Sequence, residues 1–149
     1  MLVEFVPWED RYKLGLDVVD VQHKELIRLT NELFSDCRQG KSIADEGFQK
    51  IVKAVVEYVT VHFSTEEQIM ERISYPQMTE HIAEHKLFAK TVLAEVKNFE
   101  EGKSFVPNAF ARFLRDWVLN HIAITDKKVG DYVFNMKREG LLDPILKSS

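Results

Sequence analysis

The stretch His62-Phe63-Ser64-Thr65-Glu66 places a histidine and a glutamate four residues apart within a long helical pattern. Residues four apart lie on one face of an α-helix, about one turn from each other. His81 and His85 repeat this spacing further along the chain. Because imidazole and carboxylate groups bind metals, each pair directs two donors at one place, which indicates a metal site built by helices.

The remaining histidines extend the same pattern. His23 stands alone upstream, and His121 is followed by Asp126 five residues later. Five residues correspond to about 140° around an ideal α-helix, so these two side chains cannot share a narrow face. Either the helix is distorted before Asp126, or His121 and Asp126 approach the site from different sides. The sequence leaves both arrangements open.

A lone histidine on an apolar helix face is more often a hydrogen-bonded core residue than a metal ligand. Here all five histidines lie on the apolar stripes of their segments. One metal cluster would satisfy their nitrogens together, whereas separate burial would require many polar partners. Five imidazoles exceed a four-coordinate zinc site and suit two six-coordinate ions bridged by two carboxylates. Five nitrogens and four carboxylate oxygens make nine donors, and a bridging oxygen counted once on each ion brings the total to eleven of twelve positions. The one position left open suits a small diatomic ligand.

Apolar residues recur at steps of three and four over several segments separated by short polar turns, a pattern typical of amphipathic helices. We expect helices over about residues 17–37, 45–73, 79–99 and 107–122, and a short extra helix over about 129–136. Short loops between such helices predict an all-α fold, an antiparallel up-down-up-down four-helix bundle. The expected organisation is a single domain over residues 1–149, with an N-terminal arm (1–17), a bundle (about 18–127) and a C-terminal extension (about 128–149).

The composition limits the partners of this chain. The formal net charge is −4, so we expect no basic surface that would hold nucleic acid or an anionic membrane. The one cysteine, Cys37, cannot form an internal disulfide, which suits a reducing compartment. The N-terminus lacks the pattern of a signal peptide, and no apolar run approaches the ~20 residues of a membrane span. We therefore expect a soluble, cytoplasmic protein that binds neither nucleic acid nor membrane.

The ordered set of candidate ligands resembles the hemerythrin family, in particular its bacterial members. The residues that carry the resemblance are His23, His62-x-x-x-Glu66, His81-x-x-x-His85 and His121-x-x-x-x-Asp126, with Trp8, Met70, Tyr75-Pro76, Phe88 and Trp117 around them. The resemblance extends over about residues 8–133. Each pair is a weak signal alone, but the complete ordered set is highly specific.

The resemblance implies a non-haem di-iron centre that binds O2 reversibly. The implied ligands fall into three sets: His81, His85 and His121 on one iron, His23 and His62 on the other, and Glu66 and Asp126 bridging both together with an oxo or hydroxo group. The second iron would keep the open position for O2. Four residues close in sequence to these ligands are candidates for the wall of an O2 pocket, with plain core packing as an equal alternative: Phe63, Trp117, Val118 and Ile122.

Three functions are compatible with such a centre. The first, which the resemblance favours, is storage, transport or delivery of O2 by a monomer that is not an enzyme. The second is a sensing module in which O2 or redox state alters the bundle for an unknown protein partner. The third is a di-iron enzyme that acts on peroxide or nitric oxide. Oxygen-activating bundle enzymes use carboxylate-rich sites, whereas this set is rich in histidine, which disfavours the third function.

Overall fold

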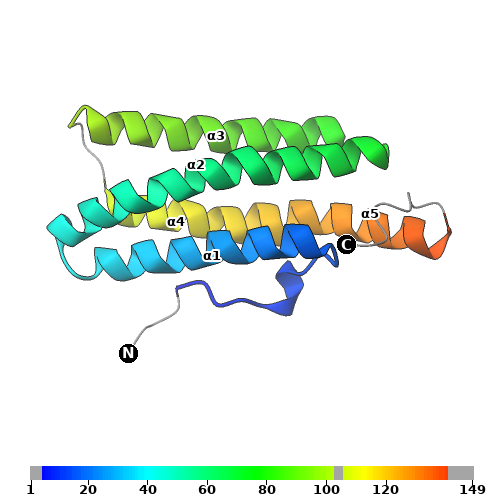
Figure 1. Ribbon diagram of the computed structural model, residues 1–149, viewed down its shortest axis with the longest axis horizontal. Helices are drawn as coiled ribbons and strands as arrows, with labels where there is room; N and C mark the ends of the chain where they lie inside the picture. Colours follow the sequence, from blue (N-terminus) through cyan, green and yellow to red (C-terminus); the bar gives the residue numbers. More distant parts are fainter. Residues whose placement is uncertain (1–4, 103–105, 141–149) are drawn as a thin grey trace.

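The computed structural model describes residues 5–102 and 106–140, and every regular element within them is helical. The elements are, in chain order, the 3-10 turn η1 (Asp10–Tyr12), α1 (Asp17–Cys37), α2 (Lys41–Arg72), α3 (Met78–Glu100), α4 (Pro107–Trp117), the π-helical segment η2 (Val118–Asp126) and α5 (Lys127–Arg138). Helices α1 to α4 alternate in direction, which confirms the predicted four-helix bundle (Figure 1). None of the described helices is long and apolar enough to cross a membrane.

Two helix boundaries differ from those expected from the sequence. Helix α2 begins at Lys41 rather than near Asp45, because Gly40 turns the chain at a positive φ of 105° and the helix follows at once. A contact of 2.6 Å between Lys41 Nζ and Asp45 Oδ2 spans this first turn. The extra helix, α5, is present, but it continues α4 through η2 as one rod (Figure 1). The part of the C-terminal extension over 141–149 lies outside the described residues.

The buried apolar residues form two clusters, and the histidines lie between them. Along α1, Val19 belongs to the smaller cluster and Leu26 to the larger, with His23 between the two. The rod repeats this order, since Ile122 belongs to the larger cluster and Val129 to the smaller. Each helix therefore carries its polar inward residues between two apolar layers that exclude water.

The N-terminal arm is fastened to the bundle by side chains of α1. Asn31 accepts a hydrogen bond from the Val6 N–H at 2.7 Å and donates one to the Val6 carbonyl at 2.8 Å. The buried Asp20 carboxylate accepts hydrogen bonds from the Leu14 and Gly15 N–H groups at 2.7 and 3.1 Å. These contacts lay the arm along α1, from Asp20 in its first turn to Asn31 in its C-terminal half.

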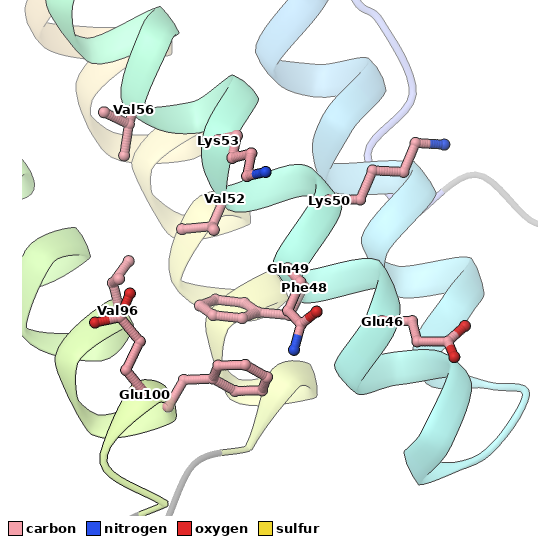
Figure 2. A pocket seen from close by; sticks show the side chains of 10 residues that line it. Glu46, Phe48, Gln49, Lys50, Val52, Lys53, Val56, Val96 and Glu100 are labelled. Atoms are coloured by element: carbon pink, nitrogen blue, oxygen red, sulfur yellow. The ribbon is translucent and has the colours of Figure 1, made fainter.

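A groove of about 880 Å³ lies between α2 and α3 (Figure 2). Its lining includes the apolar residues Phe48, Val52 and Val96 and the charged residues Lys53 and Glu100. The groove occupies the N-terminal half of α2 and the C-terminal end of α3. Because the histidines of these helices lie in the opposite halves, this groove is separate from the candidate site.

Gly130 is a point at which α5 lies very close to the arm. A Cβ atom at this position would lie 2.9 Å from the Leu14 carbonyl oxygen and 3.1 Å from the Leu14 Cβ. We predict that Gly130→Ala destabilises the protein by about 1–3 kcal/mol, because the backbone overlap outweighs the better helix propensity of alanine. Urea unfolding measures the effect.

The matched control is Asn135→Ala, an exposed position on the same helix, which should leave stability within about 0.5 kcal/mol. If Gly130→Ala is as stable as the parent, the contact between α5 and the arm is not as tight as the structure indicates.

Candidate metal centre

Seven side chains from α1, α2, α3 and η2 meet in the middle of the bundle. All are buried, with exposed fractions of 0–2%: His23, His62, Glu66, His81, His85, His121 and Asp126. Their donor atoms form two overlapping groups in which every atom lies within 4.8 Å of the others. We call them the three-histidine group (His81, His85, His121, Glu66 and Asp126) and the two-histidine group (His23, His62, Glu66 and Asp126). The structure thus brings together every residue that the sequence analysis proposed as a ligand.

The two carboxylates are shared between the groups, one oxygen to each. Glu66 Oε1 lies 2.9 Å from His81 Nε2 and 3.2 Å from His85 Nε2, whereas Glu66 Oε2 lies 3.1 Å from His62 Nε2. Such a placement is the one that a carboxylate needs to bridge two cations.

Asp126 repeats the arrangement. Its Oδ1 lies 2.9 Å from both His81 Nε2 and His121 Nε2, and its Oδ2 lies 3.0 Å from His23 Nε2. The two carboxylates therefore connect the two groups in parallel.

The donor atoms that face the middle of the cluster are poorly satisfied by the protein itself. His85 Nε2, His121 Nε2, Glu66 Oε2 and both carboxylate oxygens of Asp126 are buried, and none forms a hydrogen bond with the described residues. Unsatisfied buried polar atoms are rare and costly, and here they converge from three elements, α2, α3 and η2. A donor set of five imidazoles and two carboxylates fits two transition-metal ions, which would satisfy these atoms together.

The spacing of His121 and Asp126 is explained by a distorted helix. Residues Val118–Asp126 form a π-helix, in which the backbone bonds from residue i to i+5 instead of i+4. Side chains five apart therefore return to the same side, and His121 Nε2 lies 2.9 Å from Asp126 Oδ1. Of the two arrangements that the sequence left open, distortion of the helix is the one that occurs.

Three polar residues orient the imidazoles from outside the cluster. Glu67 accepts a hydrogen bond from His85 Nδ1 at 2.9 Å, and Glu84 accepts one from His121 Nδ1 at 2.9 Å. Gln22 Oε1 lies 2.6 Å from Nδ1 of His62 and accepts the corresponding hydrogen bond from that ring. Because carboxylate and carbonyl oxygens can only accept, the hydrogen stays on Nδ1 and each Nε2 presents its lone pair to the cluster.

None of these three residues is among the candidate site residues predicted from the sequence. A usable signal was present, since Gln22, Glu67 and Glu84 are each the sequence neighbour of a candidate ligand. A neighbour is rotated by about 100° on the helix, so it faces the adjacent helix and can reach the outer nitrogen of a histidine there.

The buried charges of the cluster compensate each other. Burial opposes protonation of His23 and His81, but the carboxylates of Asp126 and Glu66 outweigh it and raise the pKa of His23 to about 9 and that of His81 to about 10. Burial likewise opposes ionisation of the carboxylates, yet the neighbouring histidines hold the pKa of Glu66 and of Asp126 well below the ordinary value. Cations that enter the cluster must therefore displace protons from His23 and His81.

Aromatic rings pack directly on the imidazoles. Phe63 stacks on His85 with ring centroids 3.8 Å apart and planes within 1°, and Trp117 stacks on His121 at 3.8 Å and 9°. Both rings thus contact histidines of the three-histidine group. The two aliphatic residues proposed for the same pocket wall are completely buried beside them: Val118 and Ile122.

The two-histidine group has an aromatic neighbour, Tyr58, that is not among the candidate residues predicted from the sequence. The ring of Tyr58 lies parallel to that of His62, at 4.8 Å between centroids and 12° between planes. Burial, together with the charges of Asp126 and Glu66, raises the pKa of Tyr58 well above its ordinary value, and the Trp117 indole N–H offsets a part of this.

Comparison with known proteins agrees with this geometry. Residues 14–133 match the family described as the Hemerythrin HHE cation binding domain. The bacteriohemerythrin of Stenotrophomonas maltophilia is 30% identical over 126 residues, which cover 85% of this chain and 80% of that protein. The bacteriohemerythrin of Methylococcus capsulatus is 32% identical over 111 residues, or 74% of this chain and 82% of that protein. A crystal structure of wild-type hemerythrin matches with a TM-score of 0.77 and 29% identity, over 85% of this chain and 96% of that one. The chain belongs to the hemerythrin family.

Proposed function

We propose that this protein binds O2 reversibly at a non-haem di-iron centre, and that it stores, transports or delivers O2 rather than catalysing a reaction. One observation carries the proposal: Glu66 and Asp126 each direct one oxygen to the three-histidine group and the other to the two-histidine group. This is a site for two adjacent cations. The bacteriohemerythrin relatives support iron as the metal.

The proposed ligands follow from the two groups. One iron would be held by His81, His85 and His121, and the other by His23 and His62, with Glu66 and Asp126 shared between the two groups. The two-histidine group offers one nitrogen fewer than the three-histidine group, which would leave room for a small molecule on the second iron. When bound, the iron pair supplies the electrons for reversible O2 binding.

The protein residues control access to this centre and its charge. The aromatic rings of Phe63 and Trp117 cover the three-histidine side, and the apolar clusters on either side exclude water, which protects a reduced metal from uncontrolled oxidation. The hydrogen bonds of Glu67 and Glu84 fix the rings of His85 and His121. A cytoplasmic location and a monomeric state remain predictions from the sequence.

Absorption spectra of the reduced, iron-loaded protein test the proposal. We expect a visible band that appears on exposure to O2 and disappears when O2 is removed, with about two irons per chain. A band that never forms, combined with rapid turnover of peroxide or nitric oxide, would favour the di-iron enzyme. Protein that retains no iron would exclude the di-iron centre altogether.

Replacement of Glu84 tests whether its hydrogen bond with His121 contributes to metal binding. We predict that Glu84→Ala weakens iron binding by about 10- to 100-fold, because it removes the partner that orients the His121 ring. Glu84→Gln should retain most of the affinity, since the amide oxygen can still accept the hydrogen bond. Competition with a chelator of known affinity measures both variants.

The control is Glu80→Ala, which removes an exposed glutamate one turn earlier on α3. Equal iron affinity in the Glu80 and Glu84 alanine variants would show that the contact with His121 does not support metal binding.

Replacement of Trp117 tests the aromatic cover. We predict that Trp117→Leu accelerates autoxidation of the oxygenated protein several-fold, because it uncovers the His121 ring while keeping an apolar side chain in the core. Trp8→Leu, which changes the other tryptophan of the chain, is the control. The decay of the O2-dependent band gives the rate, and an unchanged rate in Trp117→Leu would reduce Trp117 to a packing role.

A further inference from the structure

Tyr58 carries a polar group that the fold does not use. It lies on α2 one turn before His62, and its ring is parallel to the His62 imidazole. Its hydroxyl is buried and forms no hydrogen bond with any described residue. A buried tyrosine hydroxyl normally has a partner, because its removal from water costs free energy that only a hydrogen bond recovers.

The surroundings of this hydroxyl belong to the candidate metal centre. The charges that act on it are the carboxylates of Asp126 and Glu66, and the nearby polar group is the Trp117 indole N–H. The indole N–H can only donate, so it can engage the phenol oxygen but cannot accept the phenol hydrogen. That hydrogen is therefore available to a further acceptor within the cluster.

The order of residues along α2 indicates where this acceptor would lie. Tyr58, His62 and Glu66 follow each other at intervals of one turn on the buried face. Glu66 occupies the side of His62 that faces the three-histidine group. Tyr58 lies one turn on the other side of His62 along α2, so a small ligand between its hydroxyl and the second metal would not have to displace Glu66.

We propose that Tyr58 is a ligand-binding residue, and that its hydroxyl donates a hydrogen bond to a small, electron-rich ligand at the metal held by His23 and His62. This inference rests on the proposed function, because it takes O2 as the natural ligand of that metal. A hydrogen bond to a charged acceptor is stronger than one between neutral groups. Tyr58 therefore selects small ligands that carry negative charge on their outer atom when bound.

The tyrosine is suited to this task because its position is fixed before a ligand arrives. The ring is held by the stack on His62 and by packing at 6.1 Å from the centroid of Phe63. Little conformational entropy is lost when the hydroxyl engages a ligand, since the surrounding core already fixes the ring. Phenylalanine would fill the same volume, so the hydroxyl is the part of Tyr58 that packing alone does not explain.

Tyr58→Phe, compared with Tyr132→Phe as the control, tests the inference with azide as an anionic probe. We expect the variant to bind its full complement of iron, to bind azide about tenfold more weakly in the oxidised state, and to release O2 faster. Absorption titration gives the azide affinity, and stopped-flow mixing gives the release rate. Tyr132→Phe should change neither quantity.

Thermal unfolding of the iron-free proteins provides a readout that does not involve the metal. Because the hydroxyl has no acceptor in the described protein, iron-free Tyr58→Phe should melt at the same temperature as the parent or higher. A lower melting temperature would show that the hydroxyl has a structural partner, and it would overturn the inference.

Unchanged azide affinity in Tyr58→Phe would also overturn the inference. The azide result for Tyr58→Phe can be distinguished from a failure of the proposed O2-carrier function. If the parent protein forms no O2-dependent band, the carrier proposal fails, while the azide comparison still supports or rejects the role of the Tyr58 hydroxyl.

Discussion

The structure depends on the burial of two carboxylates in the middle of an apolar bundle. An isolated charge at such a position would cost far more free energy than a domain of this size can supply. The bundle meets this constraint by placing five imidazoles around Glu66 and Asp126, and by raising the pKa of His23 and His81 so that these two groups carry the compensating positive charge. The two apolar clusters can then pack on either side of the site, because no buried charge is left without an opposite charge beside it.

The π-helical segment satisfies this constraint without interrupting the fourth helix. In a regular α-helix, Asp126 would be rotated by about 140° from His121 and would leave the cluster. The wider turn over Val118–Asp126 returns Asp126 to the cluster and also sets the rotation of α5, so that Val129 faces the smaller apolar cluster and Gly130 meets the arm at Leu14. One local distortion thus serves both the polar site and the packing of the end of the bundle. π-Helical turns are found frequently at functional sites for this reason.

The sequence was sufficient for the bundle and for the inward position of all seven candidate ligands, because both follow from residue spacing along single helices. It was insufficient wherever the answer depends on the rotation of one helix against another. The partners Gln22, Glu67 and Glu84 each bind a histidine on a different helix, so periodicity within one helix cannot identify them. Tyr58 lies on the same apolar stripe as its neighbours, and only the missing acceptor for its hydroxyl distinguishes it from a packing residue. The distortion before Asp126 could be stated only as one of two alternatives.

The two sides of the candidate metal centre differ in how their polar atoms are hydrogen-bonded. On the three-histidine side, the outer nitrogens of His85 and His121 are occupied by Glu67 and Glu84, and the rings are covered by Phe63 and Trp117. Of the outer polar atoms on that side, His81 Nδ1 and the Trp117 indole nitrogen are the ones without a hydrogen-bond partner among the described residues. On the two-histidine side, the stacked neighbour of His62 ends in a hydroxyl whose hydrogen has no acceptor among the described residues. A protein that retains an unsatisfied polar group in its core gives up stability there, and such a cost is expected where the group serves binding rather than folding. The unpartnered hydroxyl of Tyr58 therefore supports the proposal that the two-histidine side receives the ligand, and this support does not depend on the count of metal ligands.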